Sequence, residues 1–194
     1  MYTINEFTTY ELIVKNSKFI TILYKIDSPN IQNILNELKV TYPDATHYTY
    51  AYITGNFKKS SDDGEPSGTA GIPILKVLEN NHLTNILCVV IRYFGGIKLG
   101  ANGLVRAYTK ATANAIKETI LNELVDGLNL DITFSYQDSK NIDYLLKDIK
   151  INSKSFDDII TYNIDIETSF LEVIKKHNLK YQIIKEIKIE KKYL

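Results

Sequence analysis

Apolar and polar residues recur with two different periods along the first 122 residues, which predicts a mixture of strands and helices. Alternation over residues 46–53 is typical of a strand, and the three-to-four-residue spacing between Ile31 and Leu38 is typical of an amphipathic helix. The unbroken apolar run over residues 86–91 predicts a central strand that is buried on both faces. In order, the expected elements are two antiparallel strands within residues 3–26, a helix that begins at Ser28-Pro29, a strand at 46–53, a polar loop at 55–65, a helix at 69–79, a strand at 86–91 and a helix at 101–122.

The pattern restarts after residues 122–127, which predicts a domain boundary there. The later elements are expected to be a strand at 128–136, a helix at 140–149, a weak strand near Ile151, a strand at 159–166, a helix at 169–177 and a strand at 181–189. This βαββαβ order is typical of a ferredoxin-like domain. The sequence therefore predicts an α+β chain with an N-terminal α/β domain at residues 1–124 and a ferredoxin-like domain at residues 127–194.

Charge and composition narrow the classes of function. The 194 residues carry 23 Lys and Arg against 23 Asp and Glu, so any nucleic-acid binding must come from a local patch. No apolar run approaches 18 residues, and the N-terminus lacks the pattern of a signal peptide, so we expect a cytoplasmic protein with no membrane segment. The single cysteine, Cys88, excludes an internal disulfide, and its place in an apolar run predicts a buried, inert thiol.

The segment from Gly68 to Lys117 is locally basic and rich in glycine. It holds both arginines of the chain and has a charge balance of +5. A Gly-rich turn between a buried strand and a helix start presents free backbone N–H groups to an anion. We therefore expect a phosphate or nucleic-acid site formed by Arg92, Gly95, Gly96, Lys98, Gly100, Gly103, Arg106 and Lys110. The alternative is that the glycines serve only turns and helix packing, since Ala101-Asn102 replaces the Lys-Ser/Thr of a P-loop.

A polar, acidic loop precedes this segment and is expected to shape the site. Its residues are Asp62, Asp63, Gly64, Glu65, Gly68, Thr69 and Gly71. The carboxylates are expected to cap the next helix or to pair with Arg92 and Arg106, because the spacing of a calcium loop is missing. His47 and the nearby serines do not have the spacing of a hydrolytic site, and the sequence contains no G-x-S-x-G elbow. We therefore assign no metal, no cofactor and no catalytic residue. Whether the protein is an enzyme stays open. Tyr48, Tyr50 and Tyr52 share one strand face, and core packing is favoured there over base stacking.

Several stretches resemble the IMPACT/YigZ family. They are Asp44-Ala45-Thr46-His47, the run from Ser61 to Gly71, the run from Val89 to Gly100 and the run from Gly103 to Tyr108. The resemblance covers roughly residues 17–120 and implies an N-terminal domain like the second domain of a small-subunit ribosomal protein. It also implies a likeness in shape to the last two domains of elongation factor G. Two positions depart from the family pattern: Thr49 stands where cysteine is frequent, and Ile72 stands where a basic residue is frequent.

The resemblance also carries expectations about function. Eukaryotic members act as translational regulators and carry a further N-terminal domain, whereas this chain starts directly on the IMPACT-type domain. We expect a translation-associated regulatory protein that binds RNA or the ribosome through its Gly-rich basic surface, with a protein partner in translation control also open. The alternatives are a hydrolase that acts on a phosphorylated or peptide substrate through Asp62-Asp63-Gly64-Glu65, and a pure protein-interaction module. The sequence does not determine the oligomeric state.

Overall fold

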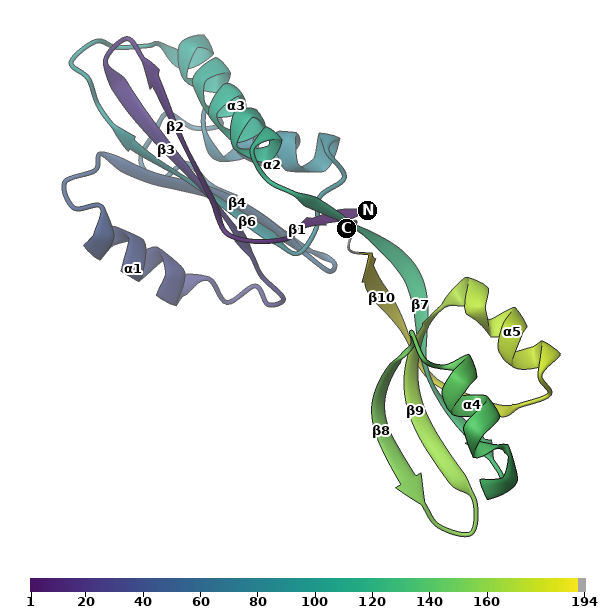
Figure 1. The fold of residues 1–194 in the computed structure, drawn as a ribbon. Coiled ribbons are helices and arrows are strands. Elements are labelled where there is room, and N and C mark those ends of the chain that lie inside the picture. The colour runs from purple at the N-terminus through teal and green to yellow at the C-terminus, as the bar shows by residue number, and fades with distance from the viewer. Residues whose placement is uncertain (192–194) are drawn as a thin grey trace. The chain divides into compact units, whose positions relative to one another are not determined.

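The computed structural model describes residues 1–191, which form two compact units (Figure 1). The first unit is Met1–Glu123, and the second begins at Leu124. The last three residues of the expected second domain, 192–194, lie outside the described residues. No described helix is long and apolar enough to cross a membrane.

The N-terminal unit is built on a five-stranded sheet in the order β2-β3-β6-β4-β5. The strands are β2 (Thr8–Val14), β3 (Ser17–Lys25), β4 (His47–Thr54), β5 (Phe57–Ser61) and β6 (Ile86–Tyr93), and all neighbours are antiparallel. Lys15 and Asn16 have positive φ values of 46° and 64°, as a tight two-residue hairpin between β2 and β3 requires. Seven of the eight β6 residues are buried, which confirms the prediction of a central strand.

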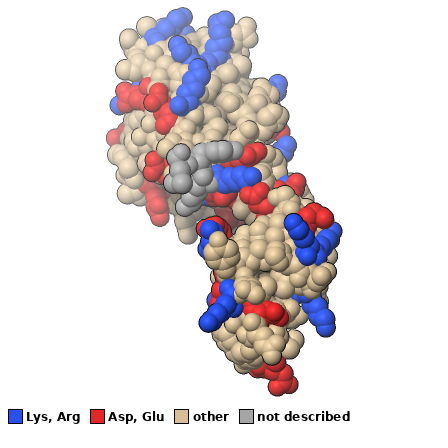
Figure 2. Space-filling view, turned by 45° about the vertical axis from the view of Figure 1, so that its right-hand side comes forward, with Lys and Arg blue, Asp and Glu red and all other residues tan. Residues whose placement is uncertain are grey.

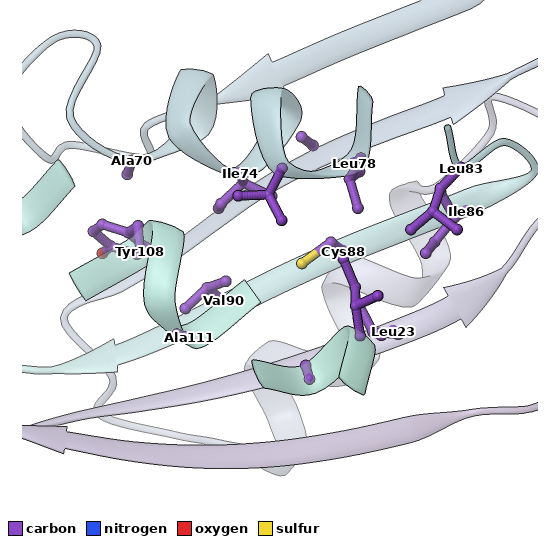
Figure 3. Packing of buried hydrophobic residues seen from close by; sticks show 14 of the residues in the cluster. Leu23, Ala70, Ile74, Leu78, Leu83, Ile86, Cys88, Val90, Tyr108 and Ala111 are labelled. Carbon is purple, nitrogen blue, oxygen red and sulfur yellow. The ribbon is translucent and has the colours of Figure 1, made fainter. Parts of the chain in front are cut away.

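Helices cover both faces of this sheet. Helix α1 (Gln32–Thr41) packs on one face, while α2 (Gly71–Asn80) and α3 (Ala101–Lys117) pack on the other (Figure 1). Side chains alternate along β6, so Val89 belongs to the α1 cluster and Cys88 to the cluster under α2 and α3 (Figure 3). Tyr52 is buried in the α1 cluster, and Tyr48 and Tyr50 pack against it. The tyrosine stripe therefore packs in the α1 cluster, as favoured.

The sequence predictions were wrong at three places in this unit. The expected loop at 55–65 contains β5, which pairs with β4 but exposes most of its side chains, so it shows no apolar pattern. Helix α1 begins at Gln32 and not at Ser28-Pro29, and the Ser28 hydroxyl instead accepts the Asn30 N–H in a local turn before the helix. Helix α3 ends at Lys117, and the residues from Leu121 onward belong to β7 (Leu121–Phe134), whose first part pairs with β1 (Tyr2–Ile4).

The second unit has its elements in the predicted βαββαβ order. These are β7, α4 (Ser139–Leu145), β8 (Lys150–Phe156), β9 (Ile160–Glu167), α5 (Leu171–Lys176) and β10 (Lys180–Lys191), with short 3-10 helices at Tyr136–Asp138 and Thr168–Phe170. The strands lie in the order β8-β9-β7-β10. Leu130, Ile132 and Ile164 pack with Ile142 and Ile174 of the two helices, so one face of the sheet is apolar. The chain is thus an α+β protein, with helices packed on each of its two sheets.

Candidate functional site

The turn from β6 to α3 and the acidic loop before α2 come together at one end of the N-terminal sheet. Gly95 lies against the β2–β3 hairpin: a Cβ at this position would meet the Asn16 carbonyl carbon at 2.0 Å. Its N–H donates to Ser17 Oγ at 3.1 Å. The close approach that glycine permits at this position is therefore to the protein's own backbone.

The other glycines of the turn leave the surface open. Gly96 and Gly100 have φ values of 81° and 71°, and a Cβ at either position would have no neighbouring heavy atom within 4 Å. Gly103 sits in the first turn of α3, where a Cβ would meet Leu99 Cβ at 3.1 Å. Gly96 and Gly100 thus leave open space beside the turn, whereas Gly103 is in contact with Leu99.

The start of α3 is an uncapped helix end. Gly100 is the N-cap residue, and no side chain makes a capping hydrogen bond there. The first intrahelical bond runs from the Leu104 N–H to the Gly100 carbonyl at 2.9 Å, so the N–H groups before Leu104 have no helical acceptor. Free N–H groups and the positive end of the helix dipole make this a favourable place for an anion.

Asp62 organises the acidic loop from within. Its carboxylate accepts backbone N–H groups of Gly68, Ala70 and Gly71 at 2.8, 3.0 and 2.8 Å. Partial burial acts to raise the pKa of Asp62, but these three donors outweigh it and hold the pKa below its ordinary value. The predicted capping of the next helix is confirmed for this residue.

The rest of the loop is held on β4 and against α2. Asp63 Oδ2 accepts the Tyr48 N–H at 2.6 Å. Gly71 packs so closely on β5 that a Cβ there would meet the Ser61 backbone nitrogen at 2.7 Å. Gly64 and Gly68 take φ values of 85° and 75°, and the Thr69 hydroxyl donates to the Pro66 carbonyl at 2.7 Å. The loop is a compact, internally bonded structure.

A buried ion pair joins this loop to β6. Arg92 Nη1 lies 2.6 Å from Glu65 Oε1, and the two side chains are 6% and 2% exposed. Arg92 Nη2 donates to Ser17 Oγ at 3.3 Å, and the Tyr108 hydroxyl donates to Glu65 Oε1 at 2.7 Å. Burial, followed by the charge of Glu65, raises the pKa of Tyr108, so the phenol stays protonated as a donor.

This pairing corrects the expectation for Arg92. We expected its guanidinium to contact phosphate, but it is enclosed between Glu65 and two aromatic rings, with Phe19 and Phe94 centroids at 5.5 and 5.6 Å. A buried guanidinium needs a carboxylate partner, and Glu65 supplies it. The predicted pairing of the loop with arginine is thus confirmed for Arg92, whereas Arg106 makes no ion pair with a described residue. Arg92 Nε remains without a hydrogen-bond partner among the described residues.

His47 lies beside this pair. Its Nδ1 is 2.8 Å from the Asp63 carbonyl oxygen, and its Nε2 is 3.8 Å from Glu65 Oε2.

The sequence reasoning missed Ser17, Tyr108 and Phe94 as members of the site. Phe94 and Tyr108 stand between expected site residues in the sequence, whereas Ser17 comes from the distant start of β3.

A pocket of about 340 Å³ opens between the ion pair and the start of α3. Phe94, Leu99 and Leu104 supply apolar walls, and Lys98 lies at the side where α3 begins. A neighbouring hollow of about 220 Å³ shares Leu99 and is bordered by Lys15, Arg106 and Lys110 (the second and third on α3). The two hollows follow the first turns of α3.

The cations around these hollows are exposed and unpaired. Lys98, Arg106 and Lys110 are exposed, and none of them forms an ion pair within residues 1–191. Helix α3 contains no acidic residue. Figure 2 shows Lys and Arg side chains gathered at the top of the N-terminal unit, where Figure 1 places the start of α3. We define Lys98, Arg106 and Lys110, together with the N-terminus of α3, as the α3 basic surface.

Comparison with known proteins places this unit in a family. Residues 15–116, more than half of the chain, match the family model described as the Impact N-terminal domain. The chain is 41% identical over 119 residues to the IMPACT family member YvyE of Bacillus subtilis (strain 168), which is 59% of this chain and 55% of that protein. It is 40% identical over 111 residues to the IMPACT family member YigZ of Escherichia coli (strain K12), which is 54% of each. The chain thus spans about half the length of the curated relatives it matches.

A solved structure matches the fold of both units. It is a crystal structure of a hypothetical protein, with a TM-score of 0.67 and 26% sequence identity. The match covers 95% of this chain and 97% of that chain.

Proposed function

The chain belongs to the IMPACT family, and from this premise we propose that it is a cytoplasmic, translation-regulatory protein that binds RNA, free or within the ribosome, through the α3 basic surface. We also propose that the N-terminal unit has a fold like the second domain of a small-subunit ribosomal protein. For the second unit we propose a ferredoxin-like fold, which the β8-β9-β7-β10 strand order supports. The translational role is the one that the resemblance to the family implies, and it is part of this proposal.

One observation carries the RNA proposal: Lys98, Arg106 and Lys110 are exposed, have no ion pair among residues 1–191, and gather at a helix without acidic residues, in a chain whose net charge is zero. Ion pairs elsewhere engage cations such as Lys58 with Glu79 and Lys150 with Asp165. Cations without partners attract a polyanion by releasing its counterions. The uncapped start of α3 adds backbone donors for phosphate oxygens.

The two alternatives receive less support from these contacts. A hydrolase would need free carboxylates in the acidic loop, but Asp62 is occupied by three N–H donors and Glu65 by Arg92 and Tyr108. A protein-interaction module would use the same α3 basic surface. Nuclease sensitivity of the bound state separates it from RNA binding.

The test compares two variants that lose the same charge. Lys98, Arg106 and Lys110 are replaced by Ala in one variant. The control replaces Lys140, Lys176 and Lys180, which are exposed residues of the second unit without ion pairs in the described part of the chain. We expect the slope of log K against log salt for a single-stranded RNA to fall by up to about two in the first variant, because three phosphate contacts are lost. The control should keep the slope of the unmodified protein.

The same variants are then followed in sucrose gradients of cell extract, with and without RNase. The unmodified protein should co-migrate with ribosomal particles in an RNase-sensitive manner, and the α3 variant should stay near the top. If both variants lose binding equally, the affinity reflects overall charge and the assigned surface is wrong. If the unmodified protein shows neither RNA affinity nor co-migration, the proposed function is overturned.

A further inference from the structure

We propose that the 340 Å³ pocket at the start of α3 takes up a single unstacked base of a single-stranded RNA, with Phe94 as the stacking platform and the adjoining phosphate at the helix N-terminus. The inference rests on the proposed function and adds to it a strandedness and a binding mode. It makes Phe94, an apolar residue, a determinant of RNA binding.

The chemistry of the pocket matches a nucleotide in two parts. Pro66, Leu99 and Leu104 give it an apolar body, and Lys98 with the backbone of Gly100 and Ala101 gives it a cationic, donor-rich side. Its volume lies at the small end of the range for sites that hold small molecules. A flat aromatic base joined to a negatively charged phosphate presents the same two halves.

Phe94 has the properties of a fixed stacking surface. It is 47% exposed although it is a large apolar residue, and it borders the pocket. The Arg92 guanidinium lies 5.6 Å from its ring centroid, and Arg92 is itself fixed by Glu65 at 2.6 Å. The Phe94 N–H also donates to Thr46 Oγ1 at 3.0 Å, which fixes the backbone. An exposed aromatic ring on a rigid support suits a base, because every base has a face that can stack.

The position of the phosphate follows from the helix end. The first N–H groups of α3 have no helical acceptor, and no side chain caps them. Lys98 is exposed beside them and has no ion pair among the described residues. Arg92 also lines the pocket, but its guanidinium is bonded to Glu65 and Ser17, so Lys98 is the lining cation left for the phosphate.

The neighbouring hollow gives a path for the rest of the strand. It shares Leu99 with the pocket and is bordered by Lys15, Arg106 and Lys110. Arg106 and Lys110 are separated by one helical turn, or about 6 Å along the axis. A row of cations that continues from a pocket for one base favours a nucleic-acid strand over an isolated nucleotide. A duplex keeps its bases stacked and paired, so only a single strand places one in the pocket.

The experiment measures binding of three fluorescent probes of equal length: a single-stranded RNA, the same strand with abasic sites, and an RNA duplex. We expect the single strand to bind about tenfold or more tightly than the abasic strand, because stacking on one aromatic side chain contributes an effect of that order. A 2-aminopurine in the single strand should change its fluorescence on binding to the unmodified protein. That spectroscopic signal depends on stacking and needs no variant.

The variants localise the effect. Phe94→Ala and Phe94→Leu should bind the single strand as weakly as the abasic strand, while Phe94→Tyr keeps the ring and should bind nearly normally. Phe57→Ala is the matched control, because Phe57 is an exposed phenylalanine of β5 at 62%. Its affinity should be unchanged.

The outcomes separate this inference from the proposed function. Equal binding of all three probes, with no 2-aminopurine response, overturns the base pocket and leaves electrostatic RNA binding intact. Failure of every probe to bind overturns both. Loss of affinity in Phe94→Tyr as large as that in Phe94→Ala also counts against stacking, because the ring alone would not account for it.

Discussion

The ion pair between Glu65 and Arg92 offers the sharpest test of how the site is held together. Its two charges are 2% and 6% exposed and lie 2.6 Å apart, and Tyr108 donates to the same carboxylate oxygen. Removing either charge leaves the other buried without its partner. The perturbations are Glu65→Gln, Arg92→Met and the two combined.

The expected cost follows from the burial of the pair. Breaking a buried ion pair by removing one partner costs about 3–5 kcal/mol, mainly because the remaining charge stays desolvated. Each single replacement is expected to fall in this range. In the double variant of Glu65 and Arg92 neither charge remains, so its cost should be smaller than the sum of the two by about 1–3 kcal/mol.

The assay is unfolding in urea with native-state hydrogen exchange on the intact chain. Exchange of the β6 amides reports on the N-terminal unit, because this strand lies at the centre of its sheet. Glu79→Gln is the control: it breaks the ion pair of Lys58 and Glu79, whose side chains are 52% and 39% exposed. Such a pair should contribute no more than about 1 kcal/mol.

Two results would refute this reasoning. If the single variants cost no more than Glu79→Gln, burial does not make the pair of Glu65 and Arg92 important for stability. If the costs add within about 0.5 kcal/mol in the double variant, the two charges are not coupled, and the distance between them has no energetic meaning.

Three further predictions concern the loop, the core and the turn. Asp62→Asn should destabilise the protein at neutral pH. The difference in stability between this variant and the unmodified protein should become smaller as pH falls through the lowered pKa of Asp62, because the carboxylate is then protonated. Thermal melts at several pH values would show this. Cys88, whose pKa burial raises to about 12, should react with a thiol reagent only after unfolding; rapid labelling of the native protein would contradict this. Gly96→Ala should cost about 1–2 kcal/mol, because alanine disfavours the positive φ at this position. Gly95→Ala should destabilise the protein far more, because only its Cβ would collide with the Asn16 backbone. Equal urea midpoints for the two variants would show that the hairpin shifts without cost and would contradict this prediction.

Local patterns of apolar and polar residues predicted most of the elements that bury one or both faces. The apolar run of β6 and the small, apolar positions of α3 are examples, since each follows directly from what the residues pack against. Strand β5 was missed because it pairs at the edge of the sheet with most of its side chains exposed, so backbone hydrogen bonds to β4 define it. The end of α3 was missed because pairing of β7 with β1, remote in sequence, overrides the helical pattern after Lys117.

The site divides in the same way. The sequence by itself determined the family, the Gly-rich turn before a helix and the local excess of cations, because each lies within a short stretch of chain. Only the tertiary structure decided which of the two arginines is available to a ligand. Arg92 is bonded to Glu65, 27 residues away, and Tyr108 reaches the same carboxylate across 43 residues. Side-chain burial depends on such distant partners, so an arginine that looks like an anion ligand in the sequence is an internal counter-ion in the fold, and Arg106 remains exposed.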